Sequence, residues 1–548
     1  MLGPVSAGFA GTLGPAFGWL PALGGEQLGV GPFRDLFATP GIWTSVRLSL
    51  STGLAATLLS LALTFATVAA LQGTRAFTLL SRALSPLLSV PHAAAAFGLA
   101  FLIAPSGWIL RAVSPWATGF ERPPDILTAH DPAGLALIIG LTVKEVPFLL
   151  LMTLSALAQA DPRQRRLAGL ALGYGPLAAW FYGVAPTVYA QIRLPVYAVL
   201  AYSMSTVEVA MILGPTTPPP LSVALVDWMN DPDLALRFRA AAGAVLQILL
   251  VVAALALWHL GERLTAALGR RLAASGRRFP ADGLLRGAAA LLATLSALAV
   301  ILGLAGLAVW SVAGFWRFPD TLPASLTLRS WDRHGPSLME PALATFTIAA
   351  TAAALATLLA AACLETEHRH GRRPTSRSLW LLYTPLLVPQ TGFLFGLQIS
   401  ASAAGVPPGA VAVTAAHLVF VLPYVFLSLS GPWRAWDRRQ GLAAQCLGAS
   451  PARIFVAVRL PMMLAPLLTA FAVGFAVSVG QYLPTLLIGA GRVATLTTEA
   501  VALSAGGDRR LIGVYALAQA AAPLPAFALA LAIPALVWRR RRGMTAAR

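Results

Sequence analysis

The stretch GASPARIFVAVRLP, residues 448–461, has the same layout as an earlier stretch, GYGPLAAWFYGVAP, residues 173–186. Both begin with glycine, end with proline after the same number of residues, and carry an internal proline at the same place, Pro176 and Pro451. Two further matches lie upstream of these stretches. Residues 90–98 match residues 388–396 around a shared Val-Pro pair, and residues 54–59 echo residues 355–359. The chain therefore reads as two tandem copies of one unit.

The matched stretches predict a short helix, a glycine elbow and a second short helix in each copy. Residues 165–172 and 440–447 are short and amphipathic, and Gly173 and Gly448 follow them. Glycine takes up the positive φ that ends a helix, and proline suits the first turn of the next one. Pro186 and Pro461 then mark the entry to a longer apolar helix. Such a unit is a rigid peg, able to transmit a push from a soluble partner.

The composition predicts an all-α membrane protein that crosses the bilayer many times. Of the 548 residues 57% are hydrophobic and only 11% are charged, whereas a soluble domain carries roughly a quarter charged residues. A run of about 20 apolar residues spans a bilayer as a helix. Residues 1–25 lack the basic start of a signal peptide and are expected to form a weak first helix. The twelve expected spans are 3–25, 43–70, 83–104, 134–158, 188–214, 239–262, 286–315, 339–363, 379–402, 409–431, 462–488 and 511–537.

The net charge of +18 is concentrated in short arginine clusters between the apolar runs. This pattern follows the positive-inside rule, so these loops and both termini are expected on the cytoplasmic side. No nucleic-acid-binding motif accompanies the charge, and nucleic acid is not expected as a partner. We predict a first transmembrane domain at 1–262, an Arg-rich cytoplasmic linker at 263–285 and a second transmembrane domain at 286–548. The clusters contain Arg263, Arg270, Arg271, Arg277, Arg278 and Arg286; Arg369, Arg372, Arg373 and Arg377; Arg434, Arg438 and Arg439; and residues 539–542.

The second peg, LAAQCLGASPARIFVAVRLP, resembles the EAA loop of binding-protein-dependent ABC importer permeases, and the first is a looser match. The likeness extends over both halves and is closest to fused permeases of the thiamine and ferric iron type. It implies two six-helix repeats of the type I fold, coupled through these loops to an ATPase dimer and served by a periplasmic solute-binding protein. The coupling residues it implies are Leu167, Ala168, Gly169, Gly173, Pro176 and Pro186 in the first half, and Leu442, Ala443, Ala444, Gly448, Pro451, Arg453 and Pro461 in the second.

One departure from the EAA pattern changes the expected coupling. The acidic residue that names the motif is replaced by Leu167 in the first copy and Leu442 in the second. A charge-assisted contact is therefore absent there, and docking is expected to depend on shape and on Arg166, Arg453 and Arg459. The chain has no GxxxxGK[ST] loop, so ATP is expected on a partner subunit, with no cofactor or metal bound here and no catalytic residue.

Polar residues inside the expected spans mark a candidate pathway, because ionisable groups in a bilayer usually face a cavity or route. Glu208 and Gln481 fall in the fifth helix of each half, and His92 and Gln390 sit beside the matched prolines. Lys144 and Glu145 are adjacent and are not expected to pair. Residues 365–370, which contain two glutamates and two histidines, read as a solvated loop rather than a metal site.

Two other classes of protein remain open at this point. A twelve-helix secondary carrier would use Glu208, Lys144 or Glu145 as ion sites, but it leaves the paired pegs unexplained. A membrane-embedded enzyme would need a constellation of acids, histidines or nucleophiles at one membrane face, and none is evident beyond residues 365–370. Thiamine-like, metal-ion and polyamine solutes are all compatible with the family resemblance.

Overall fold

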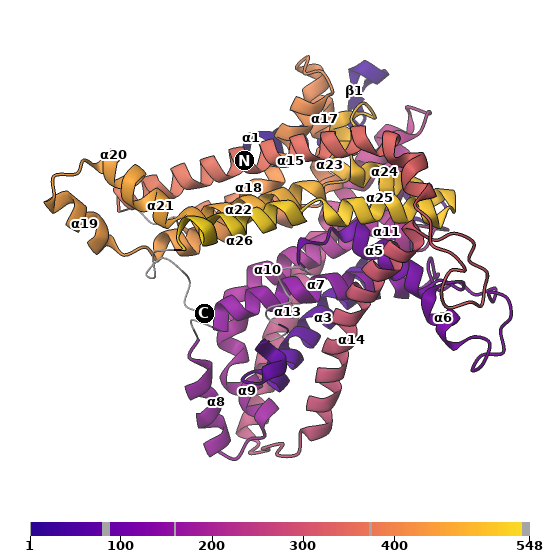
Figure 1. Ribbon diagram of the computed structural model, residues 1–548. Helices are drawn as coiled ribbons and strands as arrows, with labels where there is room; N and C mark the ends of the chain where they lie inside the picture. Colours follow the sequence, from indigo (N-terminus) through magenta and orange to yellow (C-terminus); the bar gives the residue numbers. More distant parts are fainter. Residues whose placement is uncertain (1, 79, 81–87, 158–159, 372–374, 540–548) are drawn as a thin grey trace.

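The computed structural model describes residues 2–78, 80, 88–157, 160–371 and 375–539, and its regular structure is almost entirely helical (Figure 1). This confirms the all-α class. A small antiparallel ribbon, β1 with β2, follows the first helix. The first half of the chain contains α1 (Leu2–Ala16), β1 (Trp19–Leu20), η1 (Pro21–Leu23), β2 (Gly25–Glu26), α2 (Gly31–Ala38), α3 (Ile42–Leu71), α5 (His92–Ile103), α6 (Trp108–Val113), α7 (Leu135–Leu157), α8 (Pro162–Ala171), α9 (Pro176–Gly183), α10 (Ala185–Ser205), α11 (Glu208–Leu213), α12 (Leu221–Asn230) and α13 (Leu236–Ala274).

The second half repeats the order of the main helices but has no counterpart of the ribbon or of α2 among its described elements. It contains α14 (Gly283–Ser311), α15 (Arg329–Arg369), α16 (Ser376–Leu387), α17 (Gln390–Ala403), α18 (Ala410–Arg434), α19 (Arg438–Cys446), α20 (Pro451–Ile454), the π-helical turn η2 (Phe455–Arg459), α21 (Leu460–Met462), α22 (Leu464–Val479), α23 (Leu483–Gly489), α24 (Leu496–Leu503), η3 (Ser504–Gly506), α25 (Arg509–Ala521) and α26 (Leu524–Val537).

Within the described residues, eight helices are long and apolar enough to cross a membrane, or ten when two bent pairs each count as one span. These ten correspond to ten of the twelve expected spans. The expected helix 3–25 instead ends at Ala16, before a turn in which Gly18 and Gly24 have positive φ. The expected helix 379–402 is broken between α16 and α17 at Pro389, which has no N–H to donate to the preceding turn. Residues 83–87 of the expected third span lie outside the described residues.

Matched hydrogen bonds confirm that the two halves share one architecture. The backbone N–H of Leu221, at the start of α12, donates to Ser49 Oγ on α3 at 2.9 Å. The N–H of Leu496, at the start of α24, donates to Thr345 Oγ1 on α15 at the same distance. Ser49 and Thr345 are 296 positions apart, whereas the matching residues of the runs at 54–59 and 355–359 are 300 or 301 apart. That sequence echo is therefore out of register with the structural repeat, because alanine- and leucine-rich helices match at several offsets.

The halves exchange their first helices. Helix α1 packs on α17 of the second half, and α14, the first helix of the second half, packs on the equivalent α5 of the first half. Glycines stand at both crossings. A Cβ at Gly98 on α5 would lie 2.8 Å from the carbonyl carbon of Gly303 on α14, and one at Gly396 on α17 would lie 1.9 Å from the carbonyl oxygen of Gly8 on α1. Small residues let membrane helices approach this closely.

The two halves meet at one end of the molecule and diverge toward the other (Figure 1). Helix α5 contacts α24 and α25 of the second half at the first end, where α11 also contacts α24. The opposite end carries α8 and α19 and is called the peg end below; the end where the halves meet is called the far end. Arginines of the linker and of the α18–α19 corner lie at the peg end, whereas Arg372, Arg373 and 540–542 lie outside the described residues. The expected linker is helical as far as Ala274, where α13 ends.

Candidate functional site

The first peg, residues 162–183, has the predicted helix–glycine–helix form. Helix α8 ends before Gly173, whose φ is 83°, and α9 begins at Pro176. The N–H of Tyr174 donates back to the carbonyl of Gly169 at 3.2 Å, which closes the elbow. None of the residues of α8 is buried, and Leu167 and Leu172 are 54% and 65% exposed. The peg therefore presents leucine side chains to the exterior.

The second peg, residues 438–459, repeats this geometry. Gly448 has a φ of 80°, and the N–H of Ala449 donates to the carbonyl of Ala444 at 3.0 Å. Side chains of Asp437 and Ser450 cap α19 and α20, which fixes where each short helix begins. Of the apolar side chains here, Leu442 is 58% exposed and Leu447 88% exposed. Large exposed leucines at matched places in two rigid elbows are typical of a protein-docking surface.

The membrane helices that follow the pegs begin with a sharp bend near the predicted prolines. The angle is 60° between α9 and α10, which starts at Ala185 beside Pro186. It is 68° between the segment 451–462, which contains Pro461, and α22. A rigid peg joined at a fixed angle to a long helix can pass a displacement along that helix.

Arg459 does not serve the docking role that its sequence position predicted. Its side chain is 3% exposed and donates to Glu365 Oε2 of α15, and its guanidinium lies 4.0 Å from the ring centroid of Trp436. Glu365 also accepts from Arg369 at 2.7 Å, and Glu367 pairs with Arg434 at 3.0 Å. Residues 365–369 therefore form the C-terminal end of α15, where both glutamates are held in ion pairs, and not a solvated loop. The ion pairs anchor the second peg to that helix.

We expect Glu365→Gln to destabilise the protein by about 3–5 kcal/mol, because it leaves the buried Arg459 charge without its partner. The loss of stability is measured by thermal unfolding of the purified protein in detergent. Glu367→Gln is the matched control: its partner Arg434 has a side chain that is 43% exposed, and such pairs contribute about 1 kcal/mol or less. Equal losses of stability from the two substitutions would contradict the conclusion that the Glu365–Arg459 ion pair anchors the second peg.

The first peg is anchored differently, by the linker between the halves. The N–H of Leu177 in α9 donates to Asp282 Oδ2 at 2.6 Å, and the N–H of Gly175 donates to the carbonyl of Arg278 at 3.2 Å. Trp180 is fully buried and donates to Gln72 Oε1 at the end of α3. The Arg-rich linker thus supplies the acceptors for the unpaired N–H groups at the start of α9.

A connected line of polar side chains runs along the first half where it faces the second. His92 Nε2 lies 3.1 Å from Glu145 Oε1, and the His92 ring lies 4.8 Å from the ring of Tyr202. The Tyr202 hydroxyl donates to Glu208 Oε1 at 2.9 Å. Glu145 and Glu208 are 4% and 8% exposed. The structure therefore joins the predicted His92 and Glu208 through Tyr202, a residue that the sequence did not single out.

Gln390 and Gln481 do not belong to this line of side chains, but each occupies a position that corresponds to one in the first half. Gln390 is the first residue of α17, as His92 is of α5. Gln481 lies in the break between α22 and α23, as Thr206 does between α10 and α11, and its Oε1 is a buried acceptor without a partner in the described residues. The neighbouring Tyr482 reaches across to Met211 of the first half, with Oη 3.7 Å from Sδ. Both fifth helices therefore break at the surface where the halves meet.

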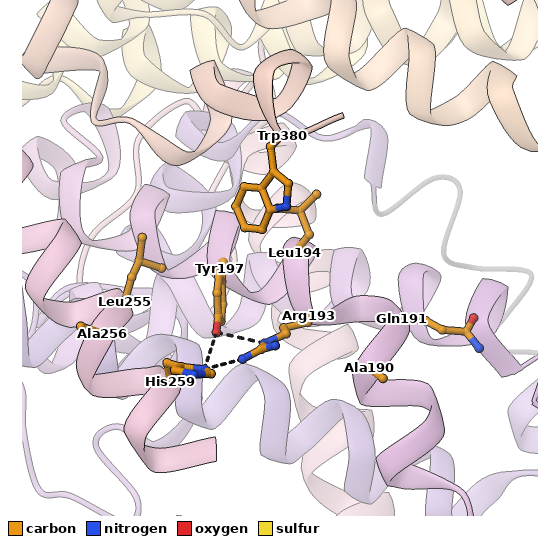
Figure 2. Close-up of a pocket in the computed structure, with 9 residues that line it drawn as sticks. All are labelled: Ala190, Gln191, Arg193, Leu194, Tyr197, Leu255, Ala256, His259 and Trp380. Carbon is orange, nitrogen blue, oxygen red and sulfur yellow. Dashed lines mark hydrogen bonds between the residues drawn. The ribbon is translucent and has the colours of Figure 1, made fainter. Parts of the chain in front are cut away.

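Two polar clusters were not predicted from sequence. In the second half, His417 is buried between Ser478 Oγ at 2.8 Å and Thr485 Oγ1 at 2.9 Å, which ties α18 to α22 and α23. Figure 2 shows Arg193 and Tyr197 of α10 turned toward His259 of α13, with Trp380 of α16 opposite, around a pocket of about 540 Å³. Glu262 pairs with Arg193. The Arg193 charge is thus compensated, and this cluster braces α10 against α13.

The fold and the site together are a duplicated all-α membrane body with two rigid pegs at one end. No protein-family model matches the chain. It is 32% identical over 458 residues to the inner membrane ABC transporter permease protein YnjC of Escherichia coli strain K12, covering 84% of this chain and 81% of that one. The chain belongs to the family of inner-membrane ABC transporter permeases, whose members are non-catalytic membrane components, and the comparison favours this class over a secondary carrier.

Two relatives cover shorter parts of the chain. The putrescine transport system permease protein PotI of Escherichia coli strain K12 is 30% identical over 141 residues, which is 24% of this chain and half of that protein. The spermidine/putrescine transport system permease protein PotC of Haemophilus influenzae is 27% identical over 145 residues, 26% of this chain and 56% of that protein. The chain matches about half the length of each of these two relatives.

Proposed function

We propose that this chain forms both halves of the translocation pathway of a binding-protein-dependent ABC importer. The observation that carries the proposal is the pair of matched pegs at one end, each presenting exposed leucines. In this proposal the peg end and both termini face the cytoplasm, and each peg docks on one subunit of an ATPase dimer that binds ATP. A periplasmic solute-binding protein delivers solute at the far end. The units 1–262 and 286–548 are the two permease domains, joined by the linker 263–285.

The proposed mechanism is alternating access. ATP-driven closure of the ATPase dimer brings the pegs together, which swings the halves and opens the far end. Solute then passes between the fifth helices, along Glu208, Gln481, His92 and Gln390. The arrangement in Figure 1, with the pegs apart and the far end closed, corresponds to the state before the ATPase closes.

Co-purification tests the proposed function. A tagged chain extracted in mild detergent from its native membrane is expected to retain a stoichiometric ATPase subunit, identified by mass spectrometry. Proteoliposomes of the chain alone are expected to take up no solute without ATP. Ion-coupled uptake by the chain alone would overturn the proposal.

Cysteine labelling tests the pathway without knowledge of the solute. Cys363 and Cys446 are exposed and are first replaced by serine. We expect Gln481→Cys to react with a small hydrophilic thiol reagent added from the far side at least tenfold faster when the ATPase is trapped with a non-hydrolysable ATP analogue, because only thiolate in contact with water reacts. Leu298→Cys, on the outer surface of α14, is the control and is expected to stay unreactive in both states. Equal rates at position 481 in both states would exclude this residue from a gated path.

A further inference from the structure

Three arginines converge on a pocket of about 370 Å³ at the far end of the molecule. The pocket is lined by Ser106, Arg111, Trp310, Gly507, Asp508, Arg509 and Arg510. It lies on the boundary between the halves, because Arg111 belongs to α6 of the first half and Arg509 and Arg510 open α25 of the second. None of the three forms an ion pair with any residue that the structure describes.

Arg111 forms the buried floor of this pocket. It is 3% exposed, and among the residues that the structure describes its guanidinium donates only to backbone carbonyls: Nε to Ser106 at 2.9 Å, and Nη1 to Arg317 and Asp320 at 2.8 Å each. The guanidinium also lies 4.8 Å from the ring centroid of Trp316. Neutral carbonyls orient the group without cancelling its charge, so the floor of the pocket stays positive.

Arg509 and Arg510 have nitrogens left over for a ligand. Arg509 uses Nη1 to reach the carbonyl of Ser106 at 3.1 Å, and Arg510 uses Nη2 to reach the carbonyl of Gly314. Arg510 Nε is a buried donor without a partner in the described part of the chain, which is costly unless something accepts from it. The one carboxylate lining the pocket, Asp508, caps the N–H of Arg510 at 3.0 Å. The pocket therefore contains more hydrogen-bond donors than acceptors, and more positive than negative charge.

We propose that this pocket binds an oxyanion, a carboxylate or a phosphate group, held by Arg509 and Arg510 at the N-terminus of α25. The 13-residue helix adds its partial positive charge there, and guanidinium groups match the geometry of such anions. Trp310 is the one apolar side chain in the lining. This composition favours an ion from the aqueous phase over a lipid, whose acyl chains would need apolar contact.

Occupation of the pocket has a consequence for the conformational cycle. The bound group would lie between α6 of one half and α25 of the other, so it would stabilise the arrangement in which the halves meet at the far end. The anion then acts as a lock on the closed far end.

Calorimetric titration with inorganic phosphate, at constant ionic strength, tests the pocket on the whole chain in nanodiscs of zwitterionic phosphatidylcholine. We expect saturable binding that Arg509→Gln/Arg510→Gln weakens about tenfold or more, since hydrogen bonds to charged groups contribute at least this much. Arg510→Lys keeps the charge but loses the buried Nε donor, so its affinity is expected to lie between those of the wild type and the double variant. Arg492→Gln, an exposed arginine after α23 outside the pocket, is the matched control and is expected to bind like the wild type.

A second series in nanodiscs containing phosphatidylglycerol separates the sources of the anion. Unchanged phosphate binding there identifies an ion from the aqueous phase, whereas loss of the phosphate signal identifies a lipid headgroup as the occupant of the same pocket. Absence of saturable binding to the wild type, or equal affinity of the wild type and the folded double variant, would overturn the proposal.

Discussion

Replacement of Gly396 by alanine is expected to destabilise the protein although it adds a single methyl group. The new Cβ would lie 1.9 Å from the carbonyl oxygen of Gly8 and 2.3 Å from the backbone nitrogen of Thr12. Both atoms belong to the backbone of α1, so no side-chain rotation relieves the clash. The crossing also carries the hydrogen bond from the N–H of Gly396 to Thr12 Oγ1 at 3.2 Å. Moving α1 away breaks this bond and opens the packing between the halves.

Overpacking of this kind costs about 1–3 kcal/mol and more where the backbone must move. Thermal unfolding in detergent, followed by size-exclusion chromatography of the heated sample, measures the loss. Gly3→Ala on α1 is the matched control, because a Cβ there meets nothing within 4 Å. Alanine is the better helix former by roughly 1 kcal/mol, so the control is expected to be neutral or slightly stabilising. A Gly396→Ala protein as stable as this control would mean that the first helices are not exchanged as described.

Local chemistry explains which parts of the fold the sequence predicts well. The elbows of the pegs are predicted to the residue, because glycine and proline restrict the backbone at Gly173, Pro176, Gly448 and Pro451 whatever the surroundings. The helices before them begin a few residues earlier than predicted, at 162 and 438. Most of the spans were predicted from apolar length. The failures at the first and ninth spans have the same origin, since Gly18, Gly24 and Pro389 interrupt apolar runs that hydropathy reads as continuous.

The remaining features of the fold and of the site depend on which helices contact each other, and the hydropathy pattern of the sequence does not contain that information. The glycines at 8, 98, 303 and 396 are each compatible with an ordinary apolar helix, and only the tertiary structure pairs them. Arg459 was expected to take part in docking because it lies at the end of a peg, but its buried partner Glu365 is 94 positions away in the chain. The duplicated prolines singled out His92 and Gln390, but they gave no indication of Tyr202, which connects His92 to Glu208.

Leucine-to-aspartate substitutions at the tips of the pegs are expected to separate the chain from its ATPase. The motif's acidic residue is absent at Leu167 and Leu442, and in the proposed docking the exposed apolar side chains supply most of the docking energy. Leu172 and Leu447 are 65% and 88% exposed and precede the two glycine elbows at matched positions. Burying one leucine contributes about 1.5–3 kcal/mol, and burying an unpaired carboxylate in its place adds a further penalty. The double variant Leu172→Asp/Leu447→Asp is therefore expected to weaken the complex by at least a hundredfold.

The measurement is the amount of ATPase subunit retained per permease chain after purification in mild detergent, compared with each single variant. Leu322→Asp provides the matched control. Leu322 is 63% exposed but lies in the loop between α14 and α15 at the far end, so its substitution is expected to leave the retained ATPase unchanged. Because neither peg leucine is buried in the chain itself, the double variant is also expected to unfold at the wild-type temperature. Full retention of the ATPase by a folded double variant would show that the pegs do not dock on it through these leucines, and would move the coupling surface to the arginines at 166 and 453.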